Sequence, residues 1–317
     1  MAWFRFLDVK YLSSFKRYIF LIYFNTPFYR RQVDKNLKFA LEIQWLSVHN
    51  KNINWDNPVT LNEKIQWLEL NTDTTLWTKY ADKYEVRGHL QELGLGEYLP
   101  KFFGVWNFPD DIDYDKLPDK FVLKCTHDSQ STLPIEKNNI NVNVINRKFK
   151  KYLKRRFGYS TCEPHYTRIK PRIIAEEWLE NTNSEISNSI IDYKVWCFNG
   201  EPTYIMTIHG RDKEHMMIDL FDKDWKRYSE YLNFSKHYRN GGGIVPRPSS
   251  LNEMLRVASV LSKGFPQVRI DFYDVNGKPY FGEMTFTSGC GRMNYFTDEA
   301  QLKMSELIKL PLMNCEL

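Results

Sequence analysis

The chain has 317 residues, a formal net charge of +5, 42% hydrophobic residues and 26% charged residues. These values argue against a disordered chain and indicate a globular protein with one large or two modest domains. None of the five cysteines forms a CxxC pair, and no histidine lies at zinc-ligand spacing from a pair of cysteines. We therefore expect reduced thiols rather than a disulfide framework or a zinc finger.

The N-terminal segment is aromatic and basic, and its longest uncharged run has twelve residues, from Tyr18 to Tyr29. Such a run is too short to span a bilayer, and it lacks the small-residue cleavage site of a signal peptide. We expect it to pack against the rest of the protein, with peripheral contact to a membrane surface as the alternative.

Residues 1–75 are predicted to be mainly helical. Thr60 and Glu63 have the spacing of a capping box, which marks the start of a helix. A second helix is predicted from Lys79 to Leu93. The stretch from Phe108 to Asp119 combines carboxylates with two prolines, so it is predicted to be a solvated loop.

The pattern changes after residue 119, where apolar runs of strand length appear between turns. A helix is predicted from Leu251 to Lys263, after a loop at Asn240 to Ser250. Two alternating runs then surround Asn276-Gly277, which predicts a β-hairpin. The mixture predicts an α+β fold with antiparallel sheets. The other predicted strands are Lys120–Cys125, Arg172–Leu179, Asp192–Phe198 and Pro202–Gly210.

The positive charge is concentrated between Arg147 and Arg156, where seven of ten residues are cationic. Ile145, Phe149, Tyr152 and Leu153 recur at helical spacing, so the cations occupy the opposite face of a helix. This face is either an ordinary solvated surface or an anion-binding surface. Nucleic acid is a weaker option, because no nucleic-acid-binding module accompanies the run.

The predicted hairpin carries a charged constellation. Asp271 lies on its first strand and Glu283 on its second, so pairing of the strands brings the two carboxylates together. Two carboxylates and phosphate oxygens are suitable ligands for Mg²⁺. Arg269, two residues before Asp271, is expected on the same face. A solvated surface pair is the alternative for such residues, but the apolar neighbours favour partial burial.

Two lysines could meet phosphates. Lys124 ends an apolar strand and precedes the hydroxyl-rich turn THDSQST, whose backbone N–H groups could wrap an anion. Lys83 lies in the preceding predicted helix. Further on, AEEWL follows a strand and could offer backbone partners to an adenine ring.

Seven segments from about Pro58 to Leu310 resemble the TupA-like ATP-grasp family in the same order. The resemblance implies an ATP-grasp fold, in which two α+β subdomains grip ATP after a mainly helical N-terminal region. We expect residues 1–75 to form that region, 76–178 the central lid subdomain, and 179–317 the C-terminal subdomain with the metal site. The segments are TLNEKIQWL, YADKYEVR, LPDKFVLKC, IIAEEWL, DYKVWCFNGEP, VRIDFYDVNGKPYFGEMTFT and SGCG.

The resemblance also implies residue roles. Lys83 and Lys124 match lysines that contact the ATP phosphates, and Arg269 matches an arginine that steadies the transferred phosphoryl group, so Lys124 and Arg269 are the candidate catalytic residues. The remaining implied roles are adenine binding by Glu176, Glu177, Trp178 and Leu179, ribose binding by Asp192, phosphate binding by Ser129, Mg²⁺ binding by Asp271 and Glu283, and an acceptor loop at Ser288, Gly289 and Gly291.

Two positions depart from the family pattern. Thr285 stands where many ATP-grasp enzymes carry an asparagine metal ligand. The phosphate loop is expected to read Asn-His-Gly-Ser-Gly, but here Thr126 to Gln130 read Thr-His-Asp-Ser-Gln. Glycine lets a backbone approach phosphate closely, and Asp128 would repel phosphate if its side chain pointed inward.

The resemblance implies an ATP- and Mg²⁺-dependent ligase that activates a carboxylate, such as a uronic acid of a surface polysaccharide, and joins it to an amine. The expected location is the cytoplasm, or the inner face of the membrane. One alternative is a glycosyltransferase, because Asp222-Lys223-Asp224 forms a DxD triplet. Another is a nucleotide-binding scaffold without catalysis, which the altered phosphate loop would explain.

Overall fold

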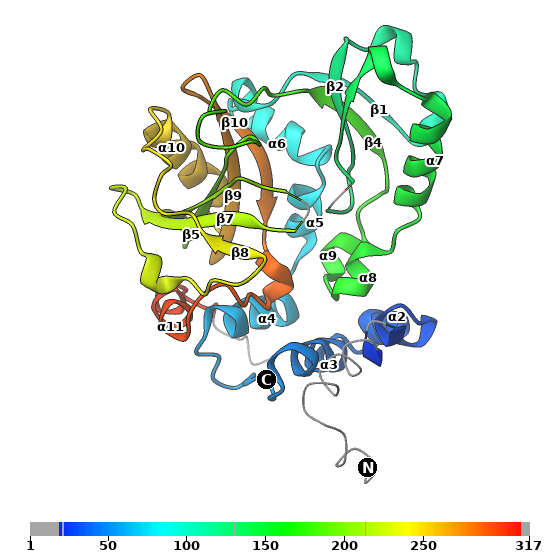
Figure 1. Cartoon of the computed structure of the whole chain (residues 1–317). Coiled ribbons are helices and arrows are strands. Elements are labelled where there is room, and N and C mark those ends of the chain that lie inside the picture. Colours follow the sequence, from blue (N-terminus) through cyan, green and yellow to red (C-terminus); the bar gives the residue numbers. More distant parts are fainter. Residues whose placement is uncertain (1–18, 21, 130, 213, 312–317) are drawn as a thin grey trace.

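The computed structural model describes residues 19–20, 22–129, 131–212 and 214–311. Two β-sheets dominate it, one with strand order β1-β4-β2-β3 and one with order β10-β9-β5-β6-β7-β8. Helices α5 and α6 lie between the sheets in Figure 1, and α2 and α3 lie beneath both. The expected α+β fold with mainly antiparallel pairing is confirmed, and among the described strands only β7 and β8 pair in parallel.

The N-terminal part is helical, as predicted. The Thr60 side chain accepts from the Glu63 backbone N–H, and the Glu63 carboxylate accepts from the Thr60 N–H, so the capping box is present. The helices of this part are α2 (Pro27–Lys35), α3 (Leu37–His49), α4 (Leu61–Asn71), α5 (Thr75–Ala81) and α6 (Glu85–Glu92).

The single helix predicted from Lys79 to Leu93 is wrong, because the chain breaks between α5 and α6. Asp82 causes the break. Its carboxylate accepts from the backbone N–H groups of Tyr84 and Glu85, at 2.8 and 3.4 Å, and pairs with Arg172 at 2.7 Å. This local capping competes with helix continuation. Lys83 therefore stands in a turn rather than on a helix face.

The four-stranded sheet contains β1 (Phe102–Trp106), β2 (Lys120–Cys125), β3 (Leu133–Glu136) and β4 (Ile173–Glu177). Helix α7 (Val142–Leu153) covers it with Ile145 and Phe149, so the predicted apolar face of the basic helix is confirmed. The short helices α8 (Phe157–Thr161) and α9 (Pro164–Thr167) follow. The predicted loop at 108–119 contains only single 3₁₀ turns, at Pro109–Asp111 and Tyr114–Lys116.

The six-stranded sheet contains β5 (Asp192–Phe198), β6 (Glu201–His209), β7 (Met216–Asp222), β8 (Tyr238–Asn240), β9 (Gln267–Val275) and β10 (Lys278–Thr285). Helix α10 (Leu251–Ser262) packs against β5, β6 and β9, and α11 (Asp298–Glu306) packs against α4. Other 3₁₀ turns are Gly96–Tyr98, Lys137–Asn139, Ser229–Tyr231 and Ser288–Gly291.

The β9–β10 hairpin turns at Asn276 and Gly277, as predicted. Their φ angles are 54° and 78°, and positive φ at both central residues is the requirement that selects Asn-Gly for such turns. The turn fixes the register of the whole hairpin.

Apolar side chains form separate clusters. The core of the four-stranded sheet runs from Ile112 to Ala175, and the core of the six-stranded sheet draws on residues 191–308. Side chains of α5 and α6, such as Trp77 and Leu90, belong to the second of these clusters. The expected subdomain limits stay a prediction, but packing associates residues 75–99 with the C-terminal sheet.

The N-terminal aromatic run is described only in part. Phe24 and Tyr29 are buried in a third cluster with α3 and Cys162, whereas Ile22 and Phe28 are exposed. Residues 1–18, which hold the rest of the basic segment, lie outside the described residues. Within the described ranges, none of the helices combines the length and apolarity needed to span a bilayer, and the four described cysteines are free thiols.

Removal of the Phe149 side chain tests the separate core of the four-stranded sheet. This ring is fully buried, so Phe149→Ala should lower the free energy of unfolding by about 3 to 5 kcal/mol through lost burial and a cavity. Val144→Ala on the exposed side of the same helix should change it by less than about 0.5 kcal/mol. Urea unfolding followed by circular dichroism measures both, and equal effects of the two variants would contradict the assignment.

Candidate functional site

The hairpin places the two predicted metal ligands opposite each other. Glu283 pairs with Asp271, and Thr285 pairs with Arg269, across β10 and β9. The register shifts by one residue at Gly282, where a side chain would meet the Asp271 carbonyl at 3.1 Å. Gly282 is therefore an extra residue on β10, and such a bulge bends the strand directly before Glu283.

Arg269 joins the polar groups of the hairpin. Its Nε and Nη2 donate to the two oxygens of Asp271 at 2.6 and 2.8 Å, a bidentate pair. Nη2 also lies 3.2 Å from Glu283 Oε1, and Nη1 lies 3.0 Å from Ser288 Oγ. Thr285 Oγ1 accepts from Nη2 at 3.1 Å. The predicted arginine, both carboxylates, Thr285 and the first residue of the acceptor loop therefore form one cluster.

Lys194 completes this cluster, and the sequence analysis missed it. It pairs with Asp271 in register between β5 and β9, and its ammonium group forms an ion pair with the Asp271 carboxylate. The sequence held a signal, because Asp192 and Lys194 are two residues apart in a predicted strand and so share a face.

The charges in this cluster stabilise one another. Burial opposes the charge of Arg269, but the carboxylates of Asp271 and Glu283 outweigh it and raise the pKa of Arg269. Burial alone would raise the pKa of Asp271, yet the positive charges of Arg269 and Lys194 hold it below its usual value. The Asp271 carboxylate is therefore ionised at neutral pH and available as an anionic ligand.

The donor set suits a hard divalent cation. Asp271, Glu283 and Thr285 offer oxygen atoms from adjacent strands, and Mg²⁺ prefers oxygen ligands with one or two carboxylates. Only 3% of the Asp271 side chain is exposed, against 35% for Glu283, so the site opens on the Glu283 side. These residues fit a magnesium ion that a nucleotide also contacts.

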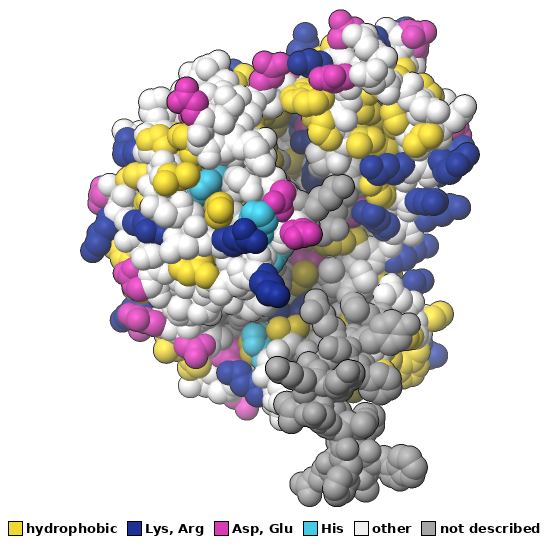
Figure 2. Space-filling model, viewed as in Figure 1, with side chains coloured by type: hydrophobic (Ala, Val, Ile, Leu, Met, Phe, Trp, Pro, Cys, Tyr) yellow, Lys and Arg dark blue, Asp and Glu magenta, His cyan; other side chains and the backbone are white. Residues whose placement is uncertain are grey.

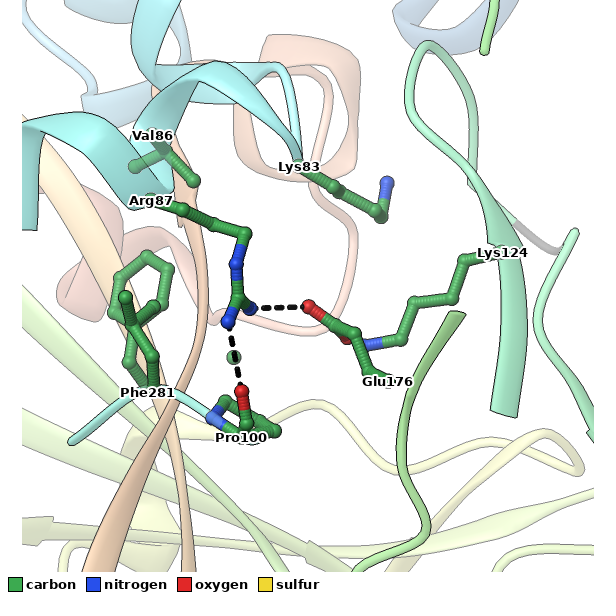
Figure 3. A pocket seen from close by; sticks show the side chains of 9 residues that line it. Lys83, Val86, Arg87, Pro100, Lys124, Glu176 and Phe281 are labelled. Carbon is green, nitrogen blue, oxygen red and sulfur yellow. Dashed lines mark hydrogen bonds and ion pairs between the residues drawn. The ribbon is translucent and has the colours of Figure 1, made fainter. Parts of the chain in front are cut away.

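A narrow pocket lies between the two sheets (Figure 3). Lys124 and Glu176 line it from β2 and β4 of the four-stranded sheet, and Lys83 lines it from the turn between α5 and α6. Phe281 and Gly282 line it from β10, directly before Glu283. The structure thus brings both predicted phosphate-binding lysines, and the first residue of the predicted adenine hinge, to the edge of the hairpin.

Glu176 is the anion at the centre of this pocket. Its side chain is only 6% exposed and forms ion pairs with Lys124 and with Arg87, whose Nη1 lies at 2.7 Å. Arg87 also donates to the Pro100 carbonyl at 2.8 Å, as Figure 3 shows. Arg87 was not among the predicted site residues. The glutamate thus neutralises two cations that face the pocket.

The rest of the predicted hinge continues past this pocket. β4 ends at Glu177 rather than Leu179, so Trp178 and Leu179 follow the strand. The Glu177 carboxylate accepts from the Lys101 N–H at 3.1 Å. Asp192, the predicted ribose ligand, pairs with Arg211 at 2.5 Å and lies opposite Tyr273 of β9.

The altered phosphate loop is held in place by contacts of Asp128 with neighbouring segments. The Asp128 carboxylate is buried, accepts a hydrogen bond from Ser131 and pairs with Arg155 at 3.2 Å. The Asp128 backbone carbonyl accepts from Lys83 Nζ at 2.6 Å. The Asp128 carboxylate is thus partnered by Ser131 and Arg155, whereas the Lys83 ammonium group contacts the Asp128 backbone carbonyl. Ser129 beside it is exposed, and Gln130 lies outside the described residues.

The predicted acceptor loop is a tight turn. Gly289 and Gly291 have φ angles of 55° and 63°, a conformation that glycine adopts without strain. A side chain at Gly291 would also lie 2.2 Å from the amide nitrogen of Gln66, which donates to the Cys290 carbonyl. Close approach to α4 thus requires glycine at this position, and it holds Ser288 beside Arg269.

The chain matches the family described as TupA-like ATPgrasp over residues 63–309, which is most of its length. The chain belongs to this ATP-grasp family. Both sheets, the narrow pocket between them and the hairpin of this ATP-grasp protein fall inside the matched region. No curated protein matches it significantly.

Solved structures similar to this ATP-grasp protein include ligases and a synthetase that are distant in sequence. D-alanine–D-alanine ligase from Bacillus anthracis shares 15% identity at a TM-score of 0.37, over 66% of this chain and 57% of that one. The ATP-grasp ligase PsnB, complexed with minimal precursor, Mg and ADP, shares 12% identity at a TM-score of 0.40, over 88% of this chain and 74% of that one. D-cycloserine synthetase DcsG shares 12% identity at 0.38, over 74% and 71%.

A buried polar cluster lies beside the predicted acceptor loop of this ATP-grasp protein. The fully buried His165 Nδ1 lies 3.5 Å from Glu69 of α4, and Thr287, beside the loop, donates to Glu163. Burial, and then the nearby Glu163 carboxylate, raise the pKa of Glu69 well above its usual value. Burial lowers the pKa of His165 to about 3. The raised pKa of Glu69 and the lowered pKa of His165 both indicate a protonated, neutral carboxyl beside a neutral imidazole.

Glu69→Gln should remove a pH dependence of stability. Below pH 4.5, the ordinary pKa of a glutamate side chain, both the folded and the unfolded carboxyl are protonated. Above it the unfolded carboxyl ionises while Glu69 stays protonated, so the wild-type protein loses up to about 1.4 kcal/mol of stability per pH unit until its folded pKa is passed. Glutamine carries no such charge.

Urea unfolding between pH 5 and pH 8 measures this effect. The stability of Glu69→Gln relative to the wild type should rise with pH, whereas Glu97→Gln, at an exposed glutamate, should follow the wild type. A constant offset between Glu69→Gln and the wild type across this range would show that Glu69 is ionised in the folded protein.

Proposed function

We propose that this protein uses ATP and Mg²⁺ to activate a carboxylate as an acyl phosphate and joins it to an amine. The observation that carries the proposal is the pairing of Asp271 with Glu283 on β9 and β10, next to a pocket lined by Lys83 and Lys124. Anionic metal ligands thus adjoin cations suited to a triphosphate.

The reaction follows from the chemistry of carboxylates. A carboxylate is a poor electrophile because oxide is a poor leaving group. Attack of a carboxylate oxygen on the γ-phosphorus of ATP breaks the bond to the β-phosphate, releases ADP and forms an acyl phosphate. The amine then attacks the carbonyl carbon, phosphate leaves, and the nitrogen loses a proton. The products are an amide, ADP and phosphate.

The side chains of this site act by position and charge. Lys83, Lys124 and Lys194 would contact phosphate oxygens, and Arg269 would steady the phosphoryl group in flight. Asp271, Glu283 and Thr285 would hold Mg²⁺, which neutralises charge on the phosphates when bound. No protein nucleophile is required.

For the acceptor we propose a sugar carboxylate, such as a uronic acid of a surface polysaccharide or its precursor, joined to an amino acid or another amine. The family resemblance and the basic surface after α7 support this substrate class. We place the reaction in the cytoplasm or at the inner face of the membrane, where ATP and polysaccharide precursors meet. Capsule or O-antigen synthesis is the corresponding process.

The two alternative functions have less support. Asp222 of the DxD triplet uses one carboxylate oxygen to accept from the N–H groups of Asp224 and Lys226, and the other accepts from Tyr228. It closes a turn after β7, and three strands separate it from β10 in the sheet. The altered phosphate loop is the basis for a scaffold without catalysis, and in the structure the Asp128 carboxylate of this loop is paired with Arg155.

Replacing both metal ligands should separate binding from catalysis. Asp271→Asn with Glu283→Gln should lower ADP release at least about a hundredfold, because developing phosphoryl charge loses its counter-ion. The wild type should gain thermal stability with a non-hydrolysable ATP analogue and Mg²⁺, since a ligand at a hundred times its Kd stabilises by about 2.7 kcal/mol. The double variant should lose the Mg²⁺-dependent part of that gain.

Asp222→Asn is the matched control, because it also removes a carboxylate from the six-stranded sheet. It should keep ADP release within about twofold of the wild type. Near-normal activity of the double variant would rule out the metal assignment, whereas loss of activity in Asp222→Asn alone would favour the glycosyltransferase.

Hydroxylamine should trap the acyl phosphate. Incubation of the protein with ATP, Mg²⁺ and a uronic acid, without an amine, should yield a hydroxamate and ADP in equal amounts, because hydroxylamine attacks the activated carbonyl. Colour formation with ferric ion measures the hydroxamate. ADP without hydroxamate would contradict the acyl phosphate, and neither product with any of several uronic acids would exclude this substrate class.

A further inference from the structure

A second cleft lies next to the phosphate loop, outside the narrow pocket between the sheets. It is open to solvent and has a volume of about 400 Å³, within the range of small-ligand sites. Three segments distant in the sequence meet there, namely α2 with the residues before it, the phosphate loop, and the chain from the end of α7 into α8. The lining residues are Asn25, Arg30, Ser129, Lys154, Arg155, Arg156, Phe157 and Ser160.

Four of the lining side chains are cationic, and few anions face them. Arg155 pairs with Asp128 at 3.2 Å. Arg30, Lys154 and Arg156 form no salt bridge with any residue that the structure describes. Arg30 donates from Nη2 to the Asn25 carbonyl at 3.2 Å, while its buried Nε has no acceptor within the described ranges. Nearby, the exposed carboxylate of Asp34 hydrogen-bonds Tyr159.

The structure divides the basic run of the sequence into two parts. On α7 itself, Lys150 pairs with Asp110 at 2.6 Å and half of its side chain is exposed. Figure 2 shows basic side chains along this edge of the molecule, where they form an ordinary solvated helix face. After Leu153 the helix ends, and the last three cations of the run, Lys154 to Arg156, turn into the cleft.

Packing holds one of these cations, Arg155, in place. The Arg155 guanidinium lies over the Tyr152 ring, 4.1 Å from its centre, as well as against Asp128. Phe157 packs edge-on against Tyr166. Ser129 joins the phosphate loop to the cleft, so an anion bound there lies beside the loop that the family resemblance assigns to the ATP phosphates.

We propose that this cleft binds the diphosphate group of the acceptor, a sugar carboxylate carried on a diphosphate. The identification of the ligand as the acceptor rests on the proposed function, but the binding of a diphosphate in this cleft does not. Arginine guanidinium groups form bidentate hydrogen bonds with phosphate oxygens, and three or more cations match the charge of a diphosphate better than that of one carboxylate. The size of the cleft leaves room for a sugar beyond the diphosphate.

Calorimetric titration with inorganic pyrophosphate tests the site without turnover. The protein is first saturated with a non-hydrolysable ATP analogue and Mg²⁺, so that the nucleotide site is occupied. The wild type should still bind pyrophosphate. Lys154→Gln with Arg156→Gln should weaken the binding about tenfold or more, because two charge-assisted contacts are lost.

Lys150→Gln with Lys151→Gln is the matched control, since it removes the same charge from the exposed face of α7. It should change the affinity for pyrophosphate less than about twofold, because exposed charges are screened within about 8 Å at physiological ionic strength. If both double variants lost the same affinity for pyrophosphate, the effect would reflect only the net charge of the protein, and this result would overturn the proposal. So would absence of binding to the wild type, or binding only when the nucleotide analogue is left out.

Two larger ligands then identify the carrier of the diphosphate. One is a nucleoside-diphosphate uronic acid in solution, and the other is a polyprenyl diphosphate in phosphatidylcholine vesicles, with plain vesicles as the control. Tighter binding of either than of pyrophosphate, lost in the cleft variant, supports the proposal and names the carrier. If neither binds more tightly, the cleft is not an acceptor site. ADP release is measured separately, so failure of the ligase reaction would leave these binding results intact.

Discussion

Asp271 cannot keep its charge inside the sheet without the cations around it. It is almost fully buried, and Arg269 and Lys194 hold its two oxygens. An unpaired buried charge would cost several kcal/mol, so the three side chains stabilise one another as a set. The same pairing keeps Asp271 ionised, which is the state that a metal ligand needs. The β9–β10 hairpin, with its bulge at Gly282, provides the geometry on which this balance depends.

The four-stranded sheet and the segment around α6 carry a second set of charges, which face the narrow pocket. Glu176 neutralises Lys124 and Arg87 across the narrow pocket, and the Asp128 carbonyl accepts from Lys83. In this arrangement every cation facing the pocket has an anionic or carbonyl partner. A triphosphate would offer new partners to the lysines, and Mg²⁺ would offer one to the carboxylates. The ion pairs between the two sheets therefore involve the same side chains that would contact a triphosphate and Mg²⁺.

The sequence predicts features that depend on neighbouring residues. The Asn276-Gly277 turn, the capping box at Thr60 and the apolar face of α7 each follow from local patterns, and the structure confirms them. Lys194 and Arg87 were missed because their partners, Asp271 and Glu176, lie 77 and 89 residues away. The pairing of the Asp128 carboxylate with Arg155 could not be predicted either, because the two residues are not neighbours in the sequence. Only the fold brings these groups together.

A crystal structure with a non-hydrolysable ATP analogue and Mg²⁺ would test the central claim most directly. We predict a magnesium ion at about 2.0 to 2.1 Å from carboxylate oxygens of both Asp271 and Glu283. The Lys194 ammonium group should have moved from Asp271 to a phosphate oxygen. A nucleotide bound elsewhere, or bound in the pocket while Asp271 keeps both Arg269 and Lys194 and no metal lies near it, would contradict the account.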